Sequence, residues 1–152
     1  MSLKTTTYSQ SRWSLADLFP GLGTPEIQTG MDELKEIVGA FEGYREQLKP
    51  DLAPEKFLAI VRDLEEFYRK GSRLHGFASL SFAGDTQDQA AQTFMAQMQQ
   101  FFAELQNRIL FFSLWWKGLD DSAAERLITG TGDYRYWLET LRQFRPHTLS
   151  EP

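Results

Sequence analysis

The sequence contains no cysteine and only two histidines, His75 and His147, among its 152 residues. Without cysteine, disulfides, thiolate nucleophiles and thiolate-based zinc sites are excluded. A zincin site needs the motif HExxH, and neither histidine is followed by Glu. A helical di-iron site needs Glu three residues before a histidine, and that spacing is absent as well. We therefore expect no catalytic residue, no cofactor site and no metal site in this chain.

Positive charge and long apolar runs are also scarce. The 16 Lys and Arg residues are outnumbered by 21 Asp and Glu, and the net charge of −5 disfavours a nucleic-acid surface. The most apolar run, residues 109–116, is far shorter than the roughly 20 residues of a membrane helix, and residues 1–10 lack the apolar core of a secretory signal. We expect contact with neither nucleic acid nor membrane. The missing cysteine fits a reducing compartment, which predicts a cytoplasmic protein.

Apolar residues recur at helical spacing along most of the chain, whose composition, 41% hydrophobic, is typical of one globular domain. Thr24 before Pro25 predicts a helix start in which the threonine side chain caps the first amides, and Pro50 predicts its end. A second helix is expected to start within residues 52–55 and to end at Gly84 in the left-handed conformation.

Two glycines, Gly71 and Gly76, lie inside this second helix. Glycine weakens a helix interior, so that we expect a bend or a close helix crossing there. A third helix is predicted over residues 86–117, with its start at Asp85 and Thr86 directly after Gly84. Two long helices with almost no linker fold back on each other, which predicts a long antiparallel helical hairpin within an elongated helical bundle.

Two shorter helices complete an all-α fold. Asp120, Asp121 or Ser122 is expected to cap a helix that runs to Ile128, and Asp133 to cap a last helix that Pro146 ends. The only segment with strand propensity is residues 4–8, a short extended N-terminal segment.

We divide the chain into an irregular lead over residues 1–23, a helical domain over residues 24–147 and a helix start over residues 148–152. Met1, Ser2 and Leu3 are consistent with vector-derived residues. Ser150 has the character of an N-cap with Glu151 after it, so that the chain stops where a helix opens. We interpret this segment as a truncated helix leading to an absent domain; a frayed tail is the alternative.

Other chemistry-bearing patterns are weak. The turns at residues 21–23 and 130–132 contain glycine pairs but neither GxGxxG nor GxxxxGK, which predicts plain turns. The acidic pairs at residues 65–66 and 120–121 are expected to serve as a solvated helix face and a helix cap. The basic residues near the C-terminus are expected to be ion-paired or to face a neighbouring domain; they are Arg135, Arg142, Arg145 and His147.

An aromatic cluster at the end of the third helix carries the most information. On a helix these side chains point in nearly all directions, so that packing on one partner helix cannot cover them. Two interpretations stay open: the cluster is core covered by residues 121–128 and the last helix, or it docks on another domain or subunit. The candidate interdomain residues are Phe111, Phe112, Trp115, Trp116, Tyr134 and Trp137.

Four stretches occur in an order that resembles the N-terminal helical region of the oligoendopeptidase F family, zinc oligopeptidases related to thimet oligopeptidase. They are WSLADLFPG at residues 13–21, LSFAGDT at 80–86, FFSLW at 111–115, and residues 134–151 with the ending RPHTLSE. Each stretch by itself is only loosely specific for the family, whereas the four stretches in this order are moderately specific for it.

The resemblance implies that the parent enzyme hydrolyses short peptides inside the cell with a zinc held by HExxH and a later Glu. Those residues belong to the family's C-terminal catalytic domain, and none occurs in this chain. The chain is thus expected to be a non-catalytic domain, inactive alone, that forms part of the substrate-channel wall. Its implied partners are the catalytic domain and, for the parent, short peptides; the zinc belongs to the parent.

The alternative function is a stand-alone helical module for protein–protein interaction. If the aromatic cluster or the last helix packs on a missing domain, we expect the isolated chain to form a homodimer or to bind a hydrophobic dye. A monomer that binds no dye would indicate that the cluster is internal core.

Overall fold

The computed structural model describes residues 13–148. The predictions for residues 1–3, for the extended segment 4–8 and for the helix start at Ser150 lie outside the described residues.

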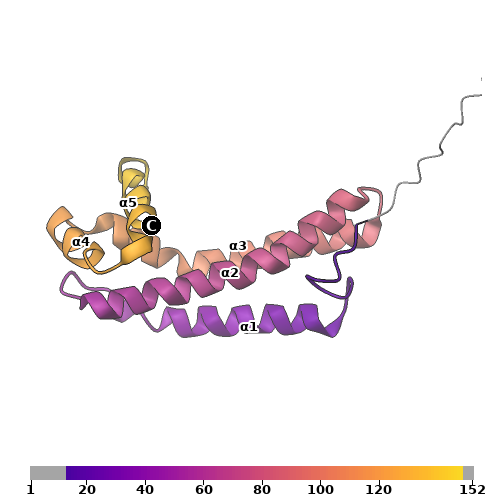
Figure 1. Ribbon diagram of the computed structural model, residues 1–152, viewed down its shortest axis with the longest axis horizontal. Helices are drawn as coiled ribbons and strands as arrows, with labels where there is room; N and C mark the ends of the chain where they lie inside the picture. Colours follow the sequence, from indigo (N-terminus) through magenta and orange to yellow (C-terminus); the bar gives the residue numbers. More distant parts are fainter. Residues whose placement is uncertain (1–12, 149–152) are drawn as a thin grey trace, which may run out of the picture.

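The fold is all-α, as the sequence predicts. The five helices are α1 (Pro25–Glu42), α2 (Pro54–Gly84), α3 (Gln89–Gly118), α4 (Asp121–Ile128) and α5 (Arg135–Gln143). Single turns of 3-10 helix occur at Arg45–Gln47, Gly132–Tyr134 and Arg145–His147, and residues 13–148 contain no strand. Helices α1, α2 and α3 lie lengthwise beside one another, with α4 and α5 gathered at one end (Figure 1). The predicted long hairpin is the antiparallel pair α2 and α3.

A single core joins the five helices. Helix α1 contributes Leu34, Val38 and Phe41, which are almost completely buried, and packs against both α2 and α3. The lead is fastened to the same bundle: the Phe19 ring lies 5.3 Å from the Phe77 ring, and Arg73 Nη2 donates to the Leu18 carbonyl at 2.7 Å. The lead therefore belongs to the folded unit from at least Leu18 onward.

The first predicted helix is shorter than expected. Helix α1 ends at Glu42, and the chain continues through the 3-10 turn before it reaches Pro50. The predicted cap by Thr24 is wrong, because its buried hydroxyl oxygen makes no hydrogen bond to any residue of 13–148. The Ile27 amide donates instead to the Thr24 carbonyl at 3.1 Å. The main chain thus satisfies the amide that the side chain was expected to cap.

The junction between α2 and α3 also differs from the prediction. Gly84 is not left-handed; among the described residues only Gly23 and Gly132 have positive φ. The cap of α3 is Asp88, whose carboxylate accepts from the Ala90 and Ala91 amides at 2.8 and 3.3 Å. Asp85 accepts from the Gln87 amide and so stabilises the turn before the helix.

Of the predicted caps of the two short helices, the cap of α4 is confirmed and the cap of α5 is wrong. Asp120 caps α4 as predicted, because its carboxylate accepts from the Ala123 amide at 2.8 Å. Asp133 lies inside a 3-10 turn, and α5 begins at Arg135 without a side-chain cap. The prediction that Asp133 caps the last helix is therefore wrong, since a preceding 3-10 turn supplies the helix start.

The expected close crossing occurs at Gly71, where a Cβ atom would lie 3.1 Å from Cε1 of Phe102 on α3. Gly76 is different, because no atom that a Cβ would newly meet among the described residues lies within 4 Å of the Cβ position. We expect Gly76→Ala to raise the free energy of unfolding by about 0.5–1 kcal/mol through helix propensity alone.

We expect Gly71→Ala to lower that free energy by about 1 kcal/mol, because the buried Phe102 ring must shift. Urea denaturation followed by far-UV circular dichroism measures both variants. An equal stabilisation of the two would contradict the close crossing.

Candidate functional site

The candidate aromatic residues of α3 lie mostly in the core. Phe111, Phe112 and Trp116 are 6%, 1% and 0% exposed. Helix α2 covers one side, where the Phe57 ring lies 5.0 Å from Trp116 and is stacked on it. Helix α1 covers another side, where the Phe41 ring lies 5.7 Å from Phe111. Neighbouring helices of the same chain thus surround a cluster that no single helix can cover.

Helix α5 covers the remaining side. The Trp116 indole N–H donates to the Leu138 carbonyl at 2.9 Å, and Leu138 itself is fully buried. Tyr134 and Trp137 are half-buried and pack against the core, as does Trp115. Of the two interpretations, core therefore holds for Phe111, Phe112 and Trp116, whose side chains have almost no surface left for another domain.

Trp115, Tyr134 and Trp137 keep part of their surface exposed. The Trp115 indole nitrogen is buried and has no hydrogen-bond partner within the described part of the chain. The Tyr134 hydroxyl donates to Glu65 at 2.6 Å, and this hydrogen bond raises the pKa of Tyr134. Tyr134 therefore binds the start of α5 to α2, which is a structural contact within this chain and not a contact with another domain.

Arg142 holds α5 against the end of α3. Its guanidinium donates to the carbonyls of Trp116 at 2.7 Å and Leu119 at 2.9 Å, and pairs with Asp121 at 2.7 Å. The guanidinium carbon also lies 5.4 Å from the centroid of the Trp116 ring. The last carbonyls of a helix have no partner within the helix, so that a cation there both caps the helix and favours its dipole.

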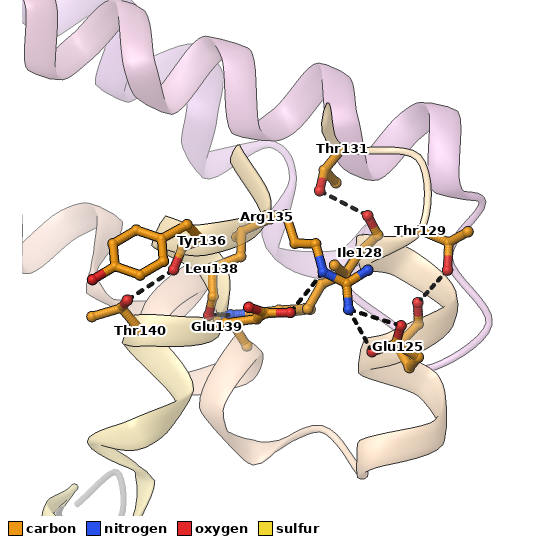
Figure 2. Close-up of polar contacts among 10 residues, drawn as sticks. Glu125, Ile128, Thr129, Thr131, Arg135, Tyr136, Leu138, Glu139 and Thr140 are labelled. Atoms are coloured by element: carbon orange, nitrogen blue, oxygen red, sulfur yellow. Dashed lines mark hydrogen bonds and ion pairs between the residues drawn. The ribbon is translucent and has the colours of Figure 1, made fainter. Parts of the chain in front are cut away.

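The other C-terminal arginines are ion-paired, as expected. Arg135 reaches Glu125 on α4 at 3.1 Å and Glu139 on α5 at 2.7 Å (Figure 2). Arg145 lies 3.6 Å from Asp121, whereas His147 is exposed. These pairs link α4 to α5, and the side chains involved are too exposed to add much stability individually.

The acidic pairs also have structural partners. Glu66 pairs with Arg69 one helical turn away at 2.6 Å. Asp120 accepts from the Ala123 amide and the Ser122 hydroxyl, and these bonds lower the pKa of its carboxyl group. A carboxylate that is engaged in a helix cap is poorly placed for proton transfer to a substrate. The acidic pairs therefore act as helix face and cap.

Residues 13–148 contain no group of three or more His, Cys, Asp or Glu side chains that could hold a metal ion. His75 lies exposed on α2, with its ring 5.7 Å from Phe102 and its Nδ1 3.4 Å from the Ser79 hydroxyl. In the same part of the chain, no helix is both long and apolar enough to cross a membrane.

Helix α5 and the residue after it expose two aromatic side chains that were not predicted from the sequence as site residues. Tyr136 is 79% exposed and Phe144, just beyond the helix, is 56% exposed. The Tyr136 ring and Thr140 lie on the side of α5 away from Arg135 and Glu125 (Figure 2). Residues 136, 140 and 144 follow one another at spacings of four, which places them along one face. That spacing was the signal available in the sequence.

The other large hydrophobic side chains that are exposed in residues 13–148 are Trp13, Tyr68, Leu80 and Leu110. The fold and these surfaces define the class of the protein, an all-α helical bundle with an aromatic face on its last helix. Comparison of the chain with family models, with curated proteins and with solved structures finds no match.

Proposed function

We propose that this chain is the non-catalytic N-terminal helical domain of an intracellular zinc metalloendopeptidase that hydrolyses short peptides. In this proposal the bundle forms part of the wall of the substrate channel, and the zinc and its ligands belong to a C-terminal catalytic domain. The proposal rests on the ordered resemblance of the four stretches to the oligoendopeptidase F family.

One observation in the fold supports the proposal beyond the resemblance itself. Four of the six large exposed hydrophobic side chains come from the resembling stretches: Trp13, Leu80, Tyr136 and Phe144. Within residues 13–148 these four side chains are between 45% and 89% exposed, so that the described part of the chain leaves them available for contact. Contact with a further domain would account for them. The resembling stretch at residues 111–115, in contrast, has Phe111 and Phe112 in the core.

The first test concerns catalysis. The isolated chain is expected to bind no stoichiometric zinc and to cleave no quenched fluorescent peptide, whereas the parent chain is expected to do both. Metal analysis and a peptide-cleavage assay with and without chelator measure this. Chelator-sensitive cleavage by the isolated 152 residues would overturn the proposal. In the natural gene, an open frame that continues into HExxH supports it, and a stop codon after Pro152 favours the stand-alone interaction module.

The second part of the same test concerns the exposed face of α5. Removal of both aromatic rings by Tyr136→Ser with Phe144→Ser is expected to raise the dissociation constant for the separately produced catalytic domain at least about tenfold, since exposed aromatic side chains dominate docking energies. The control is Tyr68→Ser, an exposed aromatic residue of α2 outside the four stretches. Calorimetric titration measures both, and an equal loss for the control would argue against α5 as the docking face.

A further inference from the structure

We draw no further inference here: the strongest candidate, the hollow between α2 and α3 that is lined by Phe67, Gly71 and Phe102, is uncharged like the groove between α1 and α3, and nothing in the structure shows what covers it.

Discussion

Replacement of Trp116 by alanine is expected to lower the free energy of unfolding by about 3–5 kcal/mol, a large part of the stability of a domain this size. Trp116 is 0% exposed, so that truncation leaves a cavity where its ring packs on Phe57 and Trp115. The change also removes the donor that bonds the Leu138 carbonyl. Since Leu138 belongs to α5, we expect the contact between α5 and the bundle to weaken first.

Urea denaturation followed by far-UV circular dichroism measures this loss. Trp13→Ala is the matched control, because it removes the same side chain from a position that is 89% exposed. We expect the control to change stability by less than about 0.5 kcal/mol. A loss below about 1 kcal/mol at Trp116 would contradict its placement at the centre of the core.

Replacement of Arg142 by methionine is expected to cost about 2–3 kcal/mol, although the position lies near the end of the described chain. Methionine retains the bulk of the side chain but leaves the Trp116 and Leu119 carbonyls without their donor. Arg142→Lys keeps the charge but not the planar fork that bonds both carbonyls and Asp121, so that we expect an intermediate loss.

The control for Arg142 is Arg135→Met. Arg135 makes its ion pairs with Glu125 and Glu139 at the surface, where solvent screens them, and we expect little change in the urea midpoint. Equal losses at the two positions would indicate that Arg142 acts only through surface charge. The hydrogen bonds from Arg142 to the end of α3 would then contribute nothing measurable.

The helices were predictable because their apolar residues recur at a period that the sequence displays directly. The helix starts were less predictable, because several residues near each start can cap it. Asp85 and Asp88 both precede α3, and only the folded turn decides that Asp88 reaches the Ala90 and Ala91 amides. Thr24 shows the same limit, since the Thr24 carbonyl accepts from the Ile27 amide in place of the hydroxyl.

The candidate site was predictable only in part. Spacing along one helix shows that Trp116 and its neighbours need cover on several sides, but it does not show which segments supply that cover. The structure shows that Phe57, Phe41 and Leu138 do so, from helices far apart in the sequence. The exposed pair Tyr136 and Phe144 was missed because apolar character alone does not distinguish the two sides of α5.

The sequence by itself determined that the protein is all-α, that α2 and α3 form a long hairpin, and that HExxH is absent from this chain. These properties depend on residue identity and on the spacing of residues within single helices. Both can be read directly from the sequence. Tertiary structure alone decided that Phe111, Phe112 and Trp116 are core, that Arg142 holds α5 against α3, and that Phe102 packs closely against Gly71. Those properties depend on which helices meet, and distances between segments far apart in the chain are set only by packing.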